Sequence, residues 1–212
     1  EDLPMLVDVL SDVLRRPTFP PVQVERLRGE IITSLQIRYQ DTRYRANRAF
    51  SEALYPSEHA YHYSTRGSLV TVPKITRDQL AAFHRTHYGP RGMIIVIVGA
   101  VNAEQAIETI RIQFEDWANP DQPEAPALPD LPALSENRRS VVNLPGKTQS
   151  DLVMGVPGPS RFAPDYQAAV LANSILGQFG MMGRIGASVR EELGLAYYAY
   201  SQVDGGFGPG PW

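Results

Sequence analysis

Arg190 and Tyr197 are the two residues whose types and spacing best suit a common site. Apolar residues recur at every fourth position from 185 to 193, which predicts one face of a short helix. Gly194 follows where a helix ends in a left-handed residue, and the Leu-Ala-Tyr-Tyr-Ala-Tyr segment after it is typical of a strand. A tight turn is therefore expected between the elements that carry Arg190 and Tyr197. The chemistry available to this pair is hydrogen-bond donation, from a guanidinium and from a phenol.

The same two residues also have a purely structural explanation. An arginine on a helix is most often a solvated surface residue, and a strand tyrosine is often half-buried. Tyr198 and Tyr200 lie beside Tyr197, which weakens any argument based on that one tyrosine. Residue types and spacing alone leave both explanations open.

The histidines and one glutamate raise the question of metal binding. His59 and His62, and again His84 and His87, have the i, i+3 spacing that can chelate zinc on a helix. The first pair falls in an irregular tyrosine-rich loop, the second falls near a helix C-terminus, and no third ligand follows at motif spacing. We therefore expect structural or surface roles for all four histidines.

Glu30 lies beside the apolar stripe of a predicted helix that Pro20-Pro21 opens. Its simplest role is an ion pair with Arg26, which lies one helical turn earlier. Spacing alone favours this ion pair.

Composition excludes several classes of protein. The 212 residues are 43% hydrophobic, which is ample for a core, and the net charge of −3 gives no electrostatic case for nucleic-acid binding. The chain has no cysteine and no apolar run of about 18 residues that could span a membrane. It begins within a helical pattern and ends directly after a strand-like one, so we expect a piece of a longer protein. The compartment is left open, since cytoplasmic, periplasmic and organellar locations fit equally.

Hydrophobic periodicity predicts a series of helices and strands. The helices cover about residues 3–16, 20–40, 44–54, 76–87, 102–117, 164–177 and 183–193, and the strands cover 93–99, 139–144, 149–156 and the segment from 195 onward. Thr76-Arg-Asp-Gln79 and Asn102-Ala-Glu-Gln105 are capping signals for two of the helices. Prolines at every third position from 120 to 132 predict an extended linker. This order predicts an α+β fold with an antiparallel or mixed sheet packed against helices.

Several segments, taken in order, resemble the pitrilysin/insulinase family of zinc metallopeptidases (the inverzincins), to which the mitochondrial processing peptidases are related. The most specific segment is Gly183-Arg-Ile-Gly-Ala-Ser-Val-Arg-Glu-Glu-Leu-Gly-Leu-Ala-Tyr197. The others are weaker but fall in the order of the family: Pro17-Thr-Phe-Pro20, Ala53-Leu-Tyr-Pro56, Ile75-Thr-Arg-Asp-Gln-Leu-Ala-Ala-Phe-His84, His87-Tyr-Gly-Pro90 and Ile95-Val-Ile-Val-Gly99. Together these segments cover nearly the whole chain.

The resemblance implies half-domains of a metallopeptidase clamshell, of the LuxS and processing-peptidase type. Residues 1–117 would be the second half of a first peptidase-like domain, 118–137 a proline-rich linker, and 138–212 the first half of a second domain. We hypothesise that the two halves complete each other through a sheet that strand 93–99 shares with strands after 138, because neither half can cover a sheet alone.

The family resemblance also implies zinc. In that family two histidines of an inverted His-x-x-Glu-His motif and a more distant glutamate hold the metal. That glutamate matches Glu30, while Gln23 stands where the family often has a second acidic residue. The inverted motif itself is absent, since both His-x-x-His segments lack its glutamate. Zinc is therefore expected in the intact parent protein, with Glu30 as one ligand, and no cofactor is expected in this piece.

The same resemblance gives Arg190 and Tyr197 a role. An arginine and a tyrosine of the family's second domain reach the substrate, and these two residues match them. The implied role is to hold a substrate carbonyl and to steady the tetrahedral oxyanion, a type of contact worth about 3–4 kcal/mol of barrier. The chain is therefore interpreted as a fragment of a zinc metalloendopeptidase that is inactive alone. Its expected partners are a peptide substrate and either another copy or a paired subunit.

Two other functions remain open. A non-catalytic structural or partner subunit of the same family fits Gln23 and the missing motif, whereas the intact pair of Arg190 and Tyr197 favours the enzyme. A peptide-binding module that uses an exposed strand edge is the third reading.

Overall fold

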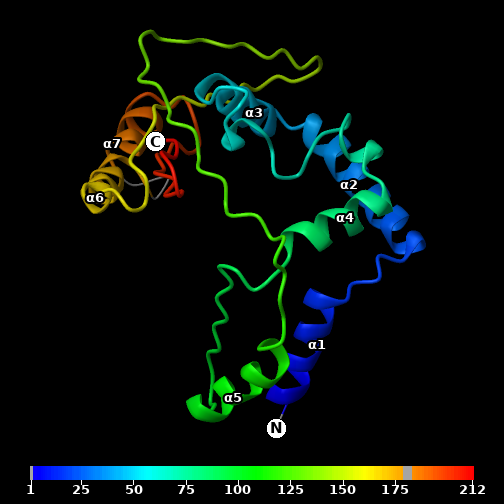
Figure 1. The fold of residues 1–212 in the computed structure, drawn as a ribbon. Coiled ribbons are helices and arrows are strands. Elements are labelled where there is room, and N and C mark those ends of the chain that lie inside the picture. Colours follow the sequence, from blue (N-terminus) through cyan, green and yellow to red (C-terminus); the bar gives the residue numbers. More distant parts are fainter. Residues whose placement is uncertain (1, 179–182) are drawn as a thin grey trace. The chain divides into compact units, whose positions relative to one another are not determined.

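Helices carry most of the regular structure of this chain (Figure 1). The computed structural model describes residues 2–178 and 183–212. Its helices are α1 (Leu3–Arg15), α2 (Pro21–Tyr39), α3 (Thr42–Leu54), α4 (Arg77–His87), α5 (Ala103–Phe114), α6 (Tyr166–Leu176) and α7 (Arg184–Gly186). Shorter helical turns are η1 (Ala60–His62), η2 (Val72–Lys74) and η3 (Ala187–Glu192). Among the described residues, no helix combines the length and the apolar character needed to cross a membrane.

Helices α4 and α5 begin where local sequence signals place them. Thr76 accepts a hydrogen bond from the Gln79 N–H at 3.1 Å, and the Gln79 side chain accepts one from the Thr76 N–H at 2.8 Å. The predicted capping box of α4 is thus confirmed. Asn102 caps α5 by accepting from the Gln105 N–H at 3.0 Å. Because such signals act within a few residues, the sequence alone can place a helix.

The predicted sheet does not form, and the α+β fold of clamshell half-domains with an antiparallel or mixed sheet is wrong. Over residues 2–178 and 183–212, the predicted strands pair into no sheet. Pairing of extended backbone there is limited to an isolated antiparallel bridge between Pro157 and Pro211. The fold is mainly helical.

The physical reason is the lack of a partner strand. Residues 93–98 alternate between more and less exposed side chains, as an extended strand does, yet Ile94 and Val98 are 85% and 92% exposed. A strand needs a neighbour to satisfy its backbone groups, so a β-branched composition is not sufficient. The hypothesis that 93–99 shares a sheet with strands after 138 is wrong for the same reason.

The chain divides into two compact units, and each is described by itself. Unit 1 comprises Glu1–Leu35 and Ser68–Pro126, and unit 2 comprises Gln36–Gly67 and Ala127–Trp212. The assignment of 1–117, 118–137 and 138–212 to parts of two peptidase domains stays a prediction. Glu1 and residues 179–182, which fall in the first and third of these segments, lie outside the described residues.

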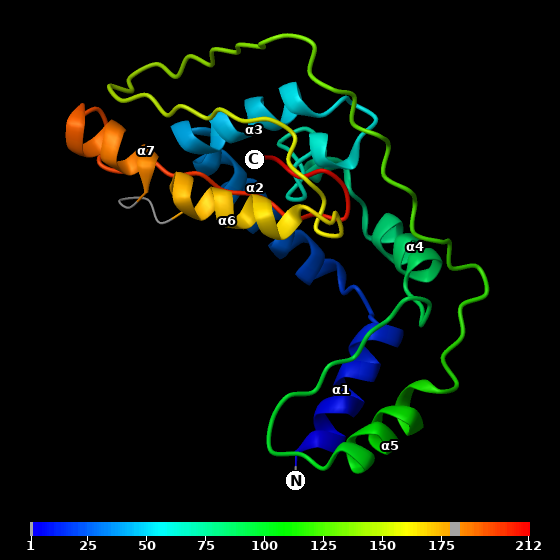
Figure 2. The ribbon, with the colours of Figure 1, turned by 90° about the vertical axis from the view of Figure 1, so that its left-hand side faces the viewer.

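In unit 1, α1 and α5 lie side by side (Figures 1 and 2). Arg15 of α1 donates to the Gln113 carbonyl at 2.7 Å and to both oxygens of Asp116 at 2.8 and 2.9 Å. Ser11 donates to the same carbonyl at 3.2 Å. The hydrogen bonds from Arg15 lower the pKa of Asp116. These contacts satisfy a carbonyl at the C-terminal end of α5, where the helix itself leaves carbonyls without partners.

In unit 2, an aromatic cluster forms the buried core at the end of α3. The His59 ring is 0% exposed and stacks on Tyr55, with ring centroids 4.8 Å apart. Its Nδ1 accepts the Tyr61 N–H at 3.1 Å, so the proton of the neutral ring lies on Nε2. Tyr55 is 3% exposed and donates its hydroxyl to the Pro209 carbonyl at 3.0 Å. This hydrogen bond ties α3 to the C-terminal segment.

Tyr55 is expected to make unit 2 less stable at alkaline pH. Burial raises its pKa from 10.0 to about 12. Its contribution to stability is complete below pH 10 and is lost as the pH rises towards about 12, because only the unfolded state ionises in that range. The expected loss is about 2 kcal/mol in the free energy of unfolding, measured by denaturant titration across this range.

Tyr55→Phe should remove this pH-dependent part of the loss, whereas Tyr63→Phe, at a tyrosine that is 63% exposed, should retain it. Identical alkaline profiles for Tyr55→Phe and the unchanged chain would contradict the assignment.

Candidate functional site

The turn that carries Arg190 has π-type geometry. In η3 the Leu193 N–H donates to the Ser188 carbonyl at 3.1 Å, five residues earlier, where an α-helix would bond four residues back. Gly194 follows with a φ of 61°, so the predicted left-handed residue is confirmed. A Cβ built on Gly194 meets no atom within 4 Å. The backbone conformation, rather than a lack of space, therefore requires glycine here.

Arg190 and Tyr197 lie together across this turn. The Arg190 guanidinium carbon is 5.3 Å from the centroid of the Tyr197 ring, within the range of a cation–π contact. The Arg190 side chain is 32% exposed and Tyr197 is 75% exposed. Arg190 also lies 3.4 Å from the carboxylate of Glu191. The predicted proximity is thus present, and both donors reach solvent.

Arg43 is a further residue of this region, which the sequence analysis missed. It lies in the first turn of α3, and its guanidinium carbon is 4.9 Å from the centroid of the Tyr198 ring. No sequence motif links the two residues, because they are far apart along the chain. The run of arginines at 43, 45 and 48 was the available signal.

Glu30 makes the ion pair that its spacing predicts. Arg26 donates to the Glu30 carboxylate at 2.5 Å and to the Gln23 side chain at 2.9 Å. The Glu30 side chain is 57% exposed. Glu30 belongs to unit 1, whereas Arg190 and Tyr197 belong to unit 2. Only the last two are brought together within one unit.

The residues present do not form a zinc site by themselves. A catalytic zinc ion takes three protein ligands, and within the described ranges no three side chains of His, Cys, Asp or Glu are grouped to hold a metal. The histidines have structural contacts instead: His62 Nδ1 lies 2.8 Å from the Tyr55 carbonyl, and His84 Nε2 lies 2.8 Å from the Leu14 carbonyl.

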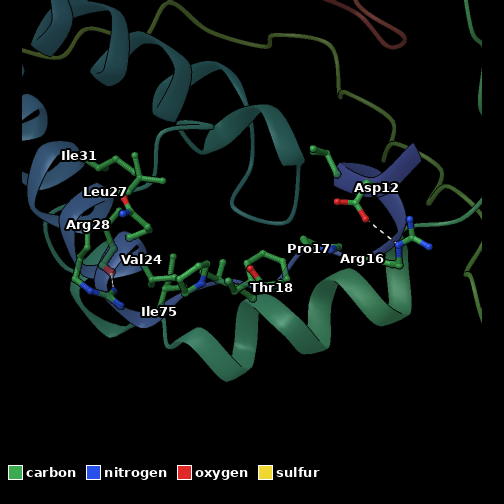
Figure 3. A pocket seen from close by; sticks show the side chains of 15 residues that line it. Asp12, Arg16, Pro17, Thr18, Val24, Leu27, Arg28, Ile31 and Ile75 are labelled. Atoms are coloured by element: carbon green, nitrogen blue, oxygen red, sulfur yellow. Dashed lines mark hydrogen bonds and ion pairs between the residues drawn. The ribbon is translucent and has the colours of Figure 1, made fainter. Parts of the chain in front are cut away.

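Unit 1 holds a mostly apolar cavity of about 590 Å³, to which Arg190 and Tyr197 do not contribute. Its walls come from α1, α2, η2, α4 and the connection between α1 and α2 (Figure 3). Apolar side chains such as Val24, Leu27 and Ile31 line most of it, and Asp12 and Arg16 form an ion pair at 2.8 Å at its edge. Most of the lining is apolar, and its charged residues Asp12, Arg16 and Arg28 are each held in ion pairs.

Comparison with known proteins identifies a peptidase-type domain. The family described as the peptidase M16 inactive domain matches residues 74–212. The chain therefore belongs to the peptidase M16 family, which confirms its resemblance to the pitrilysin group. Its relatives include an uncharacterized zinc protease of Streptomyces coelicolor, which is 29% identical over 96% of this chain and 45% of that protein. Zinc is thus associated with the family.

Two further comparisons extend this result. The beta subunit of the bovine mitochondrial-processing peptidase is 25% identical over 84% of this chain and 36% of its own length. The crystal structure of a peptidase M16 inactive domain from Pseudomonas fluorescens aligns with a TM-score of 0.74 and 26% identity, over 97% of this chain and 49% of that one. The chain therefore spans less than half the length of these relatives.

Gly194→Ala is expected to lower the free energy of unfolding by about 1 kcal/mol, because alanine is strained at positive φ. Gly29→Ala is the matched control, since a Cβ at Gly29 also meets no atom within 4 Å but the residue lies inside α2. That control should stabilise the chain by about 0.5–1 kcal/mol. Both values can be measured by urea unfolding. Equal stabilisation by the two substitutions would show that Gly194 is not held in a left-handed conformation.

Proposed function

We propose that this chain is part of a longer zinc metalloendopeptidase, in which Arg190 and Tyr197 bind the carbonyl of the peptide bond that is cut. The observation that carries the proposal is the 5.3 Å contact between the Arg190 guanidinium and the Tyr197 ring, across a turn with Gly194 at positive φ. Relatives named as zinc proteases that cover nearly all of this chain support it.

The two donors suit a single oxygen acceptor. An arginine N–H and a phenol O–H directed at a carbonyl oxygen polarise the carbonyl carbon. The same bonds strengthen as negative charge develops on that oxygen in the transition state. The cation–π contact keeps both groups together before the substrate arrives, which reduces the entropy lost on binding. Arg190 and Tyr197 are therefore proposed to position the substrate carbonyl and to polarise it. The group that attacks the carbonyl carbon comes from elsewhere.

Glu30 is the zinc ligand that this chain is proposed to supply, and the remaining ligands and the general base would lie outside it. Its carboxylate is engaged by Arg26, but the pair is exposed, with side-chain exposures of 60% and 57%. Exposed pairs contribute at most about 1 kcal/mol, so a metal ion could displace the guanidinium at small cost. With one ligand of its own, the chain alone is not expected to cut peptides.

A non-catalytic partner subunit is the second candidate. The observation that favours it is Arg26, which donates to Gln23 and Glu30 at 2.9 and 2.5 Å, so that the Glu30 carboxylate already has a partner within the chain. In that case the contact between Arg190 and Tyr197 would be structural, and the full-length protein would hold no zinc.

Tyr197→Phe in the full-length protein is expected to lower kcat on a peptide substrate about 100-fold, because one oxyanion donor is lost. Zinc content should stay unchanged, since Tyr197 is not a proposed ligand. Tyr200→Phe is the matched control, because Tyr200 is an exposed tyrosine of the same segment. Turnover of Tyr197→Phe equal to that of the unchanged protein would defeat the carbonyl role.

Glu30→Gln tests the metal role of Glu30 in the same full-length protein. Unlike Tyr197→Phe, it should lower the zinc content found by metal analysis. Glu25→Gln is its match, because Glu25 is ion-paired with Arg28 at 2.9 Å on the same helix. Full zinc content in Glu30→Gln would reject Glu30 as a ligand. A full-length protein that holds no zinc at all would favour the partner subunit.

A further inference from the structure

Two arginines flank the dipeptide Tyr197-Tyr198. The Arg190 guanidinium lies 5.3 Å from the Tyr197 ring centroid, and the Arg43 guanidinium lies 4.9 Å from that of Tyr198. The chain bends at Tyr197, and Tyr198 is 39% exposed. Both arginines and both tyrosines belong to unit 2. Arg43 is thus a second cation near Arg190 and Tyr197, the pair proposed to bind the substrate carbonyl.

Arg43 differs from the other arginines of α3 in what it contacts. Arg48 binds Glu52 at 2.7 Å and the Tyr39 hydroxyl, and Arg45 lies over the Tyr39 ring. In the part of the chain that the structure describes, no carboxylate lies within ion-pair distance of Arg43, which is exposed. Its charge is therefore not neutralised by a direct partner there.

Two carboxylates close to the first turn of α3 are already engaged by other donors. Asp41 accepts the Tyr44 N–H at 2.6 Å, and Asp151 accepts from the Thr42 hydroxyl. Arg43 itself lies over the face of the Tyr198 ring, a contact that uses none of the guanidinium N–H groups as a conventional hydrogen-bond donor. The arrangement suits a carboxylate, which an arginine can bind through two parallel hydrogen bonds.

We propose that Arg43, which lies over the Tyr198 ring, binds an acidic side chain of the peptide substrate near the bond that is cut. This inference rests on the proposed function, because it takes Arg190 and Tyr197 to hold the substrate carbonyl. An extended peptide advances about 3.3–3.6 Å per residue, so the acidic residue lies close to that carbonyl in the sequence. The expected substrate class is a peptide with Asp or Glu beside the cleavage site.

The test uses the full-length protein and pairs of peptides that differ only by Asp or Asn at one position near the cleaved bond. The unchanged protein should show a higher kcat/KM for the Asp peptide at one such position, and added salt should reduce this preference. Arg43→Gln should lower the Asp-to-Asn ratio about fivefold, the size expected for an exposed ion pair. Arg43→Lys keeps the charge and should retain part of the preference.

Arg139→Gln is the matched control, because Arg139 is an exposed arginine of the same unit and the substitution removes the same charge. Its Asp-to-Asn ratio should equal that of the unchanged protein. The inference is overturned if the unchanged protein has no preference for Asp at any position, or if Arg43→Gln leaves the ratio unaltered. An equal fall in Arg139→Gln also overturns it, since a general field effect would then explain the preference.

Tyr197→Phe separates this inference from the proposed function. It should slow the cleavage of both peptides equally and leave their ratio unchanged. If Tyr197→Phe slows both peptides while Arg43→Gln leaves the ratio unaltered, the acidic-residue site fails and the carbonyl role stands. If Tyr197→Phe has no effect while Arg43→Gln lowers the ratio, Arg43 binds the acidic residue and the carbonyl role fails.

Discussion

The left-handed conformation of Gly194 is the constraint on which the candidate site depends. With a φ of 61°, it ends the π-type turn at the point where Arg190 still points to the segment that follows. A residue with a side chain would pay about 1 kcal/mol in strain at this position, although the space beside it is open. Because the turn is short, it brings the Arg190 guanidinium to 5.3 Å from the centroid of the Tyr197 ring through local structure alone. The cation and the aromatic ring are therefore in contact within this one local element.

A second constraint governs the rest of the chain: backbone groups need hydrogen-bond partners. Helices satisfy most of theirs internally, and contacts such as those from Arg15 to Gln113 and Asp116 complete the ends. Segment 93–98 has no such local solution, and Ile94 stays 85% exposed in an extended conformation. The need for backbone hydrogen-bond partners thus favours helices, which supply their own partners, and leaves a strand-like segment such as 93–98 unpaired where no neighbouring strand is present. In unit 2, buried groups such as His59 and Tyr55 anchor the irregular segments instead.

The helices and the turn at Gly194 could be predicted because their causes lie within a few residues. The capping box at Thr76 and the left-handed residue after η3 are examples. The sequence predicted a sheet that the described residues do not form, because strand formation depends on a neighbour that composition does not reveal. The contact between Arg43 and Tyr198 was equally hidden, since it joins distant parts of the chain. For Glu30, spacing predicted the ion pair with Arg26, while its proposed metal role came from family resemblance alone.

The most direct test of the central claim is a double-mutant cycle on kcat/KM of the full-length protein, with Arg190→Gln and Tyr197→Phe. If both residues bind one carbonyl, the second substitution should cost at least about 1 kcal/mol less once the first is present. The same cycle on the free energy of unfolding should show a smaller coupling, because an exposed cation–π contact contributes only about 0.5–1 kcal/mol. Losses in kcat/KM that simply add, or a coupling no larger than that in stability, would contradict the claim that the pair acts on the substrate.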